Sequence, residues 1–497
     1  MSWIALKMLT GDKAKFCGIV LGLTFAALLI TQQGSIFCGI MCRTAGQIHD
    51  ITGADLWVMD PNVRFIDDVK PMLENNLYRV RGVRGVEWAV PLYKGNARAK
   101  INSIGFKLGR GDDPVVDPRT GHMEWGTVHE VIEQVVLLGL DDSSMVGAPS
   151  QERMLVGRLA DLRQPDAVIV DYNRLRKLFP GENWDRDQTD AAGRVIRARE
   201  PARPSFFEKA FVAIGQFARH PVEGGRYLAS QAAWGGWLAV QALRGKGSAG
   251  GEPPRPYPFR NLEREYDRQR GQFCGRFVGR TLEMNDYRAL IVGVCDATRT
   301  FQSNAVVYTS YSRAKSFAPQ ERKVLTYVLA KADPALGPQV VADRIRQQTG
   351  LRARTSRQFI DETYDYFLKY TGIPINFGIT AMLGFVIGTA IAGQTFYLFT
   401  IDNLKQFGAL KAMGATNGTI VRMILLQAMV VGLLGYGLGV GLSALFGELT
   451  KGGELAFFTH WTLLPISGVS VVLICLLSSI LSVRRVIVLE PAVVFRG

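Results

Sequence analysis

The 497-residue sequence has few histidines and cysteines, 5 and 6 respectively, and it lacks the short motifs of several enzyme classes. A phosphate-binding loop needs a Gly-Lys pair followed by Ser or Thr, but the pair Gly245 and Lys246 is followed by Gly247. The G-x-S-x-G motif of serine hydrolases does not occur. We therefore expect this chain to have no catalytic site of its own and no bound cofactor.

The nearest approach to a metal site is the segment GHMEWGTVHEVIE, which contains His122, Glu124, His129, Glu130 and Glu133. It resembles the helix of a zinc protease, but Glu133 stands where the second histidine of H-E-x-x-H belongs. The apolar run QVVLLGL follows and favours a strand, on which His129 and Glu133 share a face. We interpret these side chains as surface residues and predict no metal site.

Charge is absent from four long stretches, at residues 16–42, 370–401, 423–447 and 455–483. About 20 apolar residues in a helix cross a bilayer core, so we predict transmembrane α-helices at 16–42, 370–401, 423–447 and 457–483. The first stretch is too long for a signal peptide and lacks its small-residue cleavage pattern, which favours a retained anchor. Apart from His460 at one end, the spans have no ionisable side chain that could form an ion pathway.

The Lys and Arg residues that flank the spans predict their orientation, because cytoplasmic flanks are rich in these residues. They gather in an amphipathic N-terminal segment at 1–15, a loop at 402–422 and a tail at 484–497, whereas the loop at 448–456 has only Lys451 against two glutamates. We expect both termini in the cytoplasm and residues 44–369 outside it. The net charge of +14 belongs in large part to these flanks, and no nucleic-acid-binding motif accompanies it, which argues against nucleic acid as a partner.

Residues 44–369 contain strand-like segments mixed with helix-like ones, which indicates an α+β extracytoplasmic domain. Strands are expected at 54–61, at 86–108 with a turn at 94–96, and at 130–141, 288–297 and 323–333. A strand followed by a helix is expected at 166–179 and at 304–317. Helices are expected at 63–80 and at 335–350, where Gly350 is the C-cap. Cys274 and Cys295 lie in this domain, and whether they form a disulfide stays open.

An unusual insertion at 205–270 interrupts this pattern. Its segment FFEKAFVAIGQFARH has Phe206, Phe207, Phe211 and Phe217 on one helical face, and RGKGSAGGEPPRPYP is typical of a flexible linker. The aromatic face either packs on its own domain or lies on a membrane surface, and both interpretations stay open.

The segment TSRQFIDETYDYFLKYTGI, at 355–373, is helical by pattern and leads into the second span with only Pro374 interrupting it. We expect a stiff stalk that includes Phe359, Tyr364 and Phe367, with an ordinary connector as the alternative.

The loop at 402–422 contains QFGALKAMG, a basic segment punctuated by glycines. We expect Ala409, Leu410 and Met413 to form an apolar ridge that docks into a groove of a soluble partner; the alternative is an interfacial helix without a partner. The candidate site residues are Lys405, Gln406, Phe407, Gly408, Leu410, Lys411, Met413 and Gly414, of which Lys405, Gln406 and Lys411 are expected to face outward. The glycines allow a close approach and a helix stop.

The third span is rich in glycine, which favours tight packing between membrane helices. Gly432, Gly435 and Gly439 are the residues that we expect at such a contact, with the interface of a homodimer as its place.

The order of elements, one span, a large external domain and three further spans with a basic loop, resembles the FtsX-like, MacB-type ABC transporter permeases. The motif that carries the resemblance is IDNLKQFGALKAMGATNGTIVRMILLQAMVVGLLGYGLGVGL at 401–442, supported by the C-terminal RRVIVLEPAVVFRG. LKAMG, ADLWVMDP and IVGVCDA look most like the DevC branch. Gln406 departs from the Glu that many relatives have there. By this resemblance, residues 374–490 form an FtsX-like permease domain.

The resemblance implies a permease subunit of an ABC exporter in the bacterial inner membrane. A separate ATPase subunit binds ATP and acts on the loop at 402–422 as a coupling helix, and its motion is passed to the periplasmic domain. A homodimer, membrane lipids, a periplasmic adaptor and an outer-membrane channel are the further partners that it implies. One alternative is an FtsX-like signalling scaffold that controls a cell-wall hydrolase without transport. Another is a permease that extracts lipids or lipoproteins.

Overall fold

The computed structural model describes residues 2–105, 114–116, 123–125, 127–179, 188–189, 195–197, 200–201, 260–318, 324–450 and 454–487. The chain divides into two compact units. Residues 1–44 and 364–497 form one unit, called the membrane domain below, and residues 45–363 form the other, called the α+β domain. The aromatic face and the linker predicted within 205–270 lie outside the described residues, and so does the tail at 488–497.

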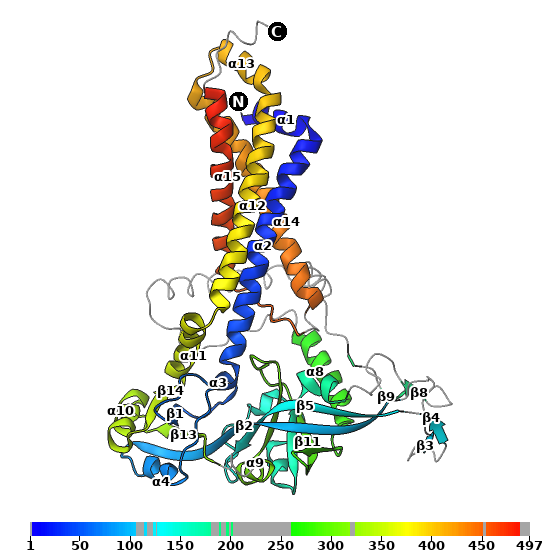
Figure 1. Cartoon of the computed structure of the whole chain (residues 1–497), viewed down its shortest axis with the longest axis vertical. Helices are drawn as coiled ribbons and strands as arrows, with labels where there is room; N and C mark the ends of the chain where they lie inside the picture. The colour runs from blue at the N-terminus through cyan, green and yellow to red at the C-terminus, as the bar shows by residue number, and fades with distance from the viewer. Residues whose placement is uncertain are drawn as a thin grey trace. The chain divides into compact units, whose positions relative to one another are not determined.

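The membrane domain consists of long helices that lie side by side, with short helices at one end (Figure 1). Its elements are α1 (Ser2–Gly11), α2 (Lys13–Thr44), α12 (Ile373–Asp402), α13 (Leu404–Ala412), α14 (Asn417–Thr450) and α15 (Leu463–Ile487). Four of these, α2, α12, α14 and α15, are long and apolar enough to cross a bilayer. The prediction of one span followed later by three is confirmed.

Helix α2 is the packing centre of the membrane domain and contacts α12, α14 and α15. Small residues allow the helices to approach closely, as expected where no water drives helix association. A Cβ atom added to Gly388 of α12 would lie 2.3 Å from the Cβ atom of Ala26 in α2. One added to Gly22 of α2 would lie 2.7 Å from Cγ2 of Ile391. A single methyl group added at either glycine would therefore clash with the neighbouring helix.

Two helix boundaries differ from the predicted ones. Helix α15 begins at Leu463, not at 457, because the preceding loop lies along α2: the amide of Phe458 donates to the carbonyl of Ser35, at 3.0 Å. Helix α11 (Ser356–Tyr370) ends before α12 begins, so the prediction that Pro374 alone interrupts the stalk is wrong. Pro374 lies in the first turn of α12, where a missing N–H is tolerated.

The α+β domain is built on a ten-stranded mixed sheet, with strand order β10-β11-β7-β12-β5-β2-β13-β1-β14 and β6 paired to β11 (Figure 1). The strands are β1 (Leu56–Met59), β2 (Val86–Gly105), β5 (Thr127–Leu140), β6 (Met154–Val156), β7 (Ala167–Asp171), β10 (Thr281–Met284), β11 (Tyr287–Cys295), β12 (Ala305–Ser310), β13 (Tyr327–Ala332) and β14 (Arg352–Thr355). The pairs β3 (Pro114–Val116) with β4 (Met123–Trp125) and β8 (Gln188–Thr189) with β9 (Val195–Arg197) are separate.

Helices and 3₁₀ turns complete the α+β domain. They are α3 (Gly46–Asp50), α4 (Asn75–Arg81), α5 (Leu175–Leu178), α8 (Arg260–Gly275), α9 (Tyr311–Phe317), α10 (Pro338–Thr349), the start of α11, and 3₁₀ turns at Gln151–Arg153, Leu159–Arg163 and Tyr172–Arg174. Gly350 ends α10 in the left-handed conformation, with φ of 71°, as predicted. The α+β class of this domain is confirmed.

Strand β2 runs without a turn through residues 94–96, so the predicted turn is wrong. Its first part, Val86 to Leu92, pairs with β13, and its second part, Tyr93 to Gly105, pairs with β5. Gly95 and Asn96, which read as turn residues, lie opposite Leu137 and Val136 in this ladder. Ladder pairing on a partner strand overrides the local turn preference.

The predicted helix at 63–80 is reduced to α4, Asn75–Arg81. Phe65 and Val69 lie in turns and irregular backbone, and Met72 forms an isolated bridge with Leu325. Pro71 explains this break, because the residue before a proline is disfavoured in the α conformation.

The described residues of the α+β domain form two hydrophobic cores. The larger packs around β5, β7, β11 and β12 and includes Phe277 and Val307, and the smaller packs around β1, β13 and α10 and includes Val328 and Ile345. Cys274 and Cys295 are both buried and free, so they form no disulfide. Strand β2 contributes to both cores, through Ala89 in the smaller and Ala97 in the larger.

Candidate coupling site of the membrane domain

Helix α13 connects α12 to α14, and its inner face packs into the membrane domain. Phe407 is fully buried against Ile420, Ile424 and Val486. Leu410 is buried in a neighbouring cluster with Ala5 and Met423. Gly408 is buried as well. Helix α13 is therefore held by α1, α14 and α15 and does not lie loosely on the surface.

The outer face of α13 is exposed. It consists of Lys405, Gln406, Ala409, Ala412 and Met413, which recur at the three- and four-residue spacing of one helix side. Met413 is 75% exposed, a large value for an apolar side chain. The predicted ridge of Ala409, Leu410 and Met413 is wrong, because Leu410 turns to the buried side, about 100° around the helix from Ala409. The surface open to a partner mixes one cation, one amide and a protruding methionine.

Gly414 ends α13 in a Schellman motif. Its φ is +93°, a value that favours glycine, and its amide donates to the carbonyl of Lys411 at 3.0 Å. The next amide, of Ala415, donates to the carbonyl of Leu410 at 3.0 Å, and Ala415 packs against the apolar cluster that contains Leu410. Both the hydrogen bonds and the apolar contact of this motif are present.

Lys411 does not face outward, which corrects its predicted orientation. Its Nζ donates to the carbonyls of Val486, at 2.8 Å, and Ile487, at 2.9 Å. These carbonyls belong to the last turn of α15, where main-chain carbonyls have no N–H donor within the helix and carry a partial negative charge. Lys411 therefore joins the end of α13 to the end of α15.

Further polar contacts brace the same end of the membrane domain. Gln427, buried in α14, donates to the carbonyl of Ala5 in α1 at 2.7 Å. Lys15 at the start of α2 pairs with Asp12, at 3.1 Å, and with Asp402 at the end of α12. These contacts join α1 to α14 and α2 to α12.

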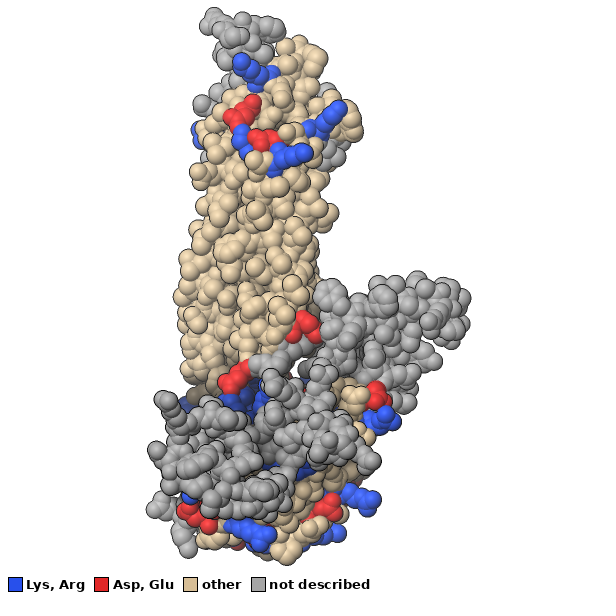
Figure 2. All heavy atoms as spheres, turned by 90° about the vertical axis from the view of Figure 1, so that its right-hand side faces the viewer, with Lys and Arg blue, Asp and Glu red and all other residues tan. Residues whose placement is uncertain are grey.

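Positive charge dominates this end (Figure 2, where it is the upper end of the helices). Among the described residues, both acidic side chains of this end, Asp12 and Asp402, are engaged by Lys15. The described basic residues of this end are Lys7, Lys13, Lys15, Lys405, Lys411, Arg422 and Arg484.

The α14 glycines pack within one chain. A Cβ atom on Gly432 would lie 2.6 Å from Sγ of Cys475 in α15, and one on Gly439 would lie 2.6 Å from the Cβ atom of Ala27 in α2. Gly435 meets Leu23 of α2 at 2.7 Å in the same way. Their tight packing was foreseeable, but their assignment to a dimer interface is wrong, because α2 and α15 of the same chain occupy that face.

The stalk residues divide between the two units. Phe359 is fully buried in the α+β domain, with its ring centroid 5.5 Å from that of Trp57 and 6.1 Å from that of Tyr327. Tyr364 and Phe367 follow in the part of α11 that belongs to the membrane domain, where Phe367 is buried.

The metal-site candidates do not come together in the described part of the chain. His129 lies in β5 opposite Ser103, and Glu133 lies opposite Ala99. His122 is outside the described residues.

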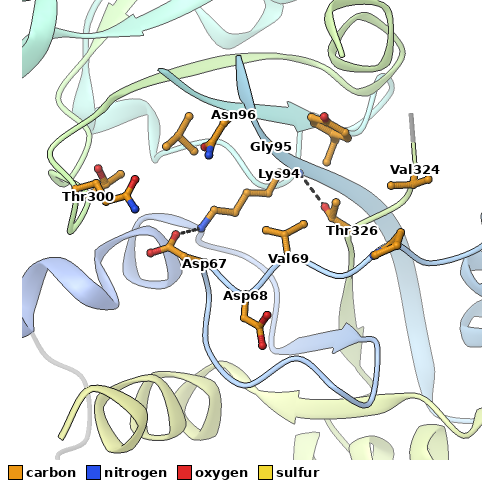
Figure 3. A pocket seen from close by; sticks show the side chains of 13 residues that line it. Asp67, Asp68, Val69, Lys94, Gly95, Asn96, Thr300, Val324 and Thr326 are labelled. Atoms are coloured by element: carbon orange, nitrogen blue, oxygen red, sulfur yellow. Dashed lines mark hydrogen bonds and ion pairs between the residues drawn. The ribbon is translucent and has the colours of Figure 1, made fainter. Parts of the chain in front are cut away.

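A second candidate site is a pocket of about 480 Å³ in the α+β domain (Figure 3). It lies where β2 passes from its pairing with β13 to its pairing with β5. Its polar lining includes Asp67, Lys94, Asn96, Thr300 and Gln302.

Lys94 is the buried cation of this pocket. Its Nζ donates to the carbonyl of Ile66, at 2.9 Å, and to Asp67, at 2.5 Å, and its main-chain amide donates to Oγ1 of Thr326. Burial lowers the pKa of Lys94, and the Asp67 carboxylate only partly opposes this. The sequence contains one signal of this buried cation: Lys94 is the single lysine in the mostly apolar segment VEWAVPLYKG. The turn predicted at 94–96 hid this signal.

Asp171 at the end of β7 is a second buried ionisable group. Its Oδ1 accepts hydrogen bonds from the amide of Asn173, at 3.1 Å, and the amide of Ala297, at 3.3 Å. Its Oδ2 is buried and has no hydrogen-bond partner among the described residues. Burial, with a smaller effect of the nearby Asp296, raises the pKa of Asp171 to about 7 although the hydrogen bonds oppose it.

Comparison with known protein families gives a match within the membrane domain of this chain. Residues 377–491 match the model of the family described as FtsX-like permease C-terminal. The ABC transporter permeases Mb2592 of Mycobacterium bovis and Rv0072 of Mycobacterium tuberculosis are 31% and 29% identical over 119 residues, which is 24% of this chain and 33% of each relative. The chain thus matches about a third of the length of these curated relatives.

Two solved structures also align with it. The extracellular domain of the noncanonic ABC-type transporter YknZ from Gram-positive bacteria covers 61% of this chain and 98% of its own, with 11% identity and a TM-score of 0.26. The periplasmic region of MacB from Actinobacillus actinomycetemcomitans covers 65% and 96%, with 10% identity and a TM-score of 0.29. TM-scores this low do not establish a shared fold.

The four apolar helices and the matched relatives make this an integral membrane protein. Within it, residues 377–491, which contain α13, match the family described as FtsX-like permease C-terminal, and the matched relatives are ABC transporter permeases. The expected resemblance to FtsX-like ABC permeases is thereby confirmed for this part of the chain, and the MacB type and the DevC branch stay predictions.

Proposed function

We propose that this chain is the permease subunit of an ABC exporter and that α13 is the element on which a separate ATPase subunit acts. The observation that carries the proposal is the two-sided build of α13: its inner face is packed into the FtsX-like domain and its outer face is exposed. An element that must receive a push needs a free surface and a firm connection behind it. Helix α13 has both, through Met413 outside and Phe407 inside.

The transmission that we propose runs from α13 into the long helices and then along the chain into the α+β domain. The chain passes between the two units twice, at residues 44–45 and 363–364. Just after the first passage, Asp50 is buried and accepts hydrogen bonds from Arg153 and from the amide and hydroxyl of Thr298, the amide at 2.6 Å. In this proposal, motion of α2 is passed through Asp50 to the segment before β6 and the segment after β11.

The second passage is anchored in a similar way. Glu362 of α11 accepts from Arg352, at 2.8 Å, and from Arg354, at 2.6 Å, both on β14. Phe359, one turn earlier, is packed against Trp57 and Tyr327. These contacts support a mechanical role for the start of α11, although α11 and α12 are separate helices.

In this proposal two copies of the chain and two ATPase subunits form the transporter in the inner membrane, with both termini in the cytoplasm. An adaptor and an outer-membrane channel complete the export path, and the substrate is handled by the extracytoplasmic α+β domain. An FtsX-like signalling scaffold that controls a cell-wall hydrolase is the competing function.

The test is affinity purification of the full chain and of two matched variants from the native membrane. Met413→Glu places a charge on the outer face of α13, whereas Gly11→Glu places the same charge at an exposed position of α1 with no atom within 4 Å of a new Cβ. We expect Met413→Glu to lose the co-purifying ATPase and its stimulated ATP hydrolysis by tenfold or more, as for an interface hot spot of about 2 kcal/mol, and Gly11→Glu to keep both.

Equal ATPase recovery from both variants contradicts the role of α13. An ATPase recovered together with a cell-wall hydrolase, and without an adaptor, favours the signalling scaffold instead. Lys411 and Gly408 are poor test positions, because they are held in contacts or buried inside the membrane domain.

A further inference from the structure

An apolar groove of about 590 Å³ lies between α14 and α15 at the basic end of the membrane domain. Val421 and Leu425 line it from α14, and Leu476, Ile480, Val483 and Arg484 line it from α15. The hydroxyl of Ser479, which also borders the groove, donates to the carbonyl of Leu476 within its own helix. The groove therefore offers an apolar surface with one charged group, the Arg484 guanidinium.

Arg484 is exposed and has no ion pair among the described residues. Arg422 is exposed on α14, next to the lining residue Val421, and it likewise has no ion pair within the described ranges. The two described acidic side chains of this end, Asp12 and Asp402, are already engaged by Lys15. Among the described residues, the groove thus ends beside two arginines that have no acidic partner.

We propose that this groove binds one anionic phospholipid, with an acyl chain against Ile480 and Leu425 and the phosphate at Arg484. The apolar part matches hydrocarbon, and arginine is suited to phosphate because its planar guanidinium donates two parallel hydrogen bonds. An arginine near the end of a spanning helix also lies at headgroup depth, where phosphate is found. The site goes beyond the proposed function, since it needs neither an ATPase nor a transported substrate.

A second copy of the chain fits the groove less well than a lipid does. A two-fold contact through the groove brings each surface against itself, so Arg484 of one copy approaches Arg484 of the other. No described acidic residue near the groove is free to separate these charges. Charge complementarity therefore favours the anionic lipid.

The position of the groove gives the lipid a regulatory role. Ile487, whose carbonyl accepts from Lys411 of α13, also borders the groove. A lipid that fills the groove orders the last turns of α15, and these turns are the support on which α13 rests. Anionic lipid is thus expected to stiffen the connection between α13 and the membrane domain.

The experiment is native mass spectrometry of the purified, delipidated full chain in detergent, titrated with phosphatidylglycerol or phosphatidylcholine. We expect phosphatidylglycerol to bind about fivefold more tightly, the effect of about one interfacial cation, and this preference to fall with added salt. Arg484→Gln should remove the preference, whereas Lys405→Gln, an equal charge loss on the exposed face of α13, should keep it. Ile480→Trp should weaken both lipids by filling the groove.

Equal affinity of the two lipids for the unchanged chain overturns the proposal, and so does an equal loss in Arg484→Gln and Lys405→Gln. Binding of inorganic phosphate that matches phosphatidylglycerol reveals a phosphate site without a lipid requirement and also overturns it. Cross-links between Ile480→Cys residues of two copies in native membranes assign the groove to a dimer contact instead. Because the lipid preference and its salt dependence are measured on the unchanged chain, the result stands even where a variant fails to fold.

Discussion

Asp171 offers the sharpest test of the electrostatics of the α+β domain. The change is Asp171→Asn, which keeps the acceptor oxygen for the amides of Asn173 and Ala297 and removes the charge. The pKa of Asp171 is raised to about 7 in the folded protein, above its ordinary value of 3.8. A raised pKa means that the folded state holds this proton more tightly than the unfolded chain does. The stability that it contributes is complete at low pH and is lost as the pH rises through about 7.

The size of this pH effect on stability follows from the interval between the ordinary pKa of 3.8 and the folded-state pKa of about 7. Each pH unit between the two pKa values changes the free energy of unfolding by about 1.36 kcal/mol. From about pH 5 to the folded pKa of about 7, the wild-type domain loses about 3 kcal/mol through this group, and it loses little more above that. For a domain of this size, about 3 kcal/mol corresponds to roughly 5–10 °C in the midpoint of thermal unfolding.

The assay is thermal unfolding of the full chain in lipid nanodiscs between about pH 5 and pH 8, with cleavage of the α+β domain by a protease as the readout. We expect the midpoint of the wild type to fall relative to that of Asp171→Asn as the pH rises. Asp141→Asn is the matched control: desolvation opposes it, but hydrogen bonds from Ser143 and Ser144 lower the pKa of Asp141 overall, so its contribution is lost only below the ordinary pKa of 3.8 and its profile should stay parallel to that of the wild type over the assayed range. Parallel profiles for the wild type and Asp171→Asn would refute the reasoning.

Three further predictions concern packing and backbone. Gly439→Ala should destabilise the membrane domain by about 1–3 kcal/mol, because its Cβ meets the backbone of α2, whereas Gly437→Ala has open space and should be neutral in a detergent-resistance assay. Asp67→Ala should destabilise the α+β domain more than Lys94→Met, since it leaves a buried ammonium group without its carboxylate; equal unfolding midpoints would contradict this. Gly414→Ala, at φ of +93°, should weaken the end of α13 by about 1–2 kcal/mol and expose it to protease, with Gly414→Asn less affected.

The long helices and most strands could be predicted because their signals are local. A charge-free run as long as residues 423–447, within α14, has few alternatives, and AVIVD in β7 is apolar enough to indicate a buried strand. Strand β2 could not be read in full, because the residues that keep Gly95 and Asn96 extended belong to β5. No local signal reports a partner strand.

The candidate coupling site shows a different limit. The sequence identified the segment, but the faces of α13 depend on which neighbours bury it, and the contacts of Leu410 come from α1 and α14. Lys411 donates to main-chain carbonyls, and because every residue has a carbonyl, the sequence does not indicate which one is the partner. Likewise, the spacing of Gly435 and Gly439 indicates close helix packing but does not distinguish a helix of the same chain from one of a second copy.

Strand β2 has a consequence for the order in which the domain forms during synthesis. Its first part pairs with β13, and the bond between Lys94 and Thr326 that flanks this pairing joins residues 232 positions apart. Strand β1 lies between β13 and β14 in the sheet, so it has no strand partner until almost the whole domain has been made. Long-range pairing of this kind is slow and leaves apolar strand edges exposed. The nascent chain therefore has a long interval in which VEWAVPL needs protection from aggregation, of the kind that a chaperone gives.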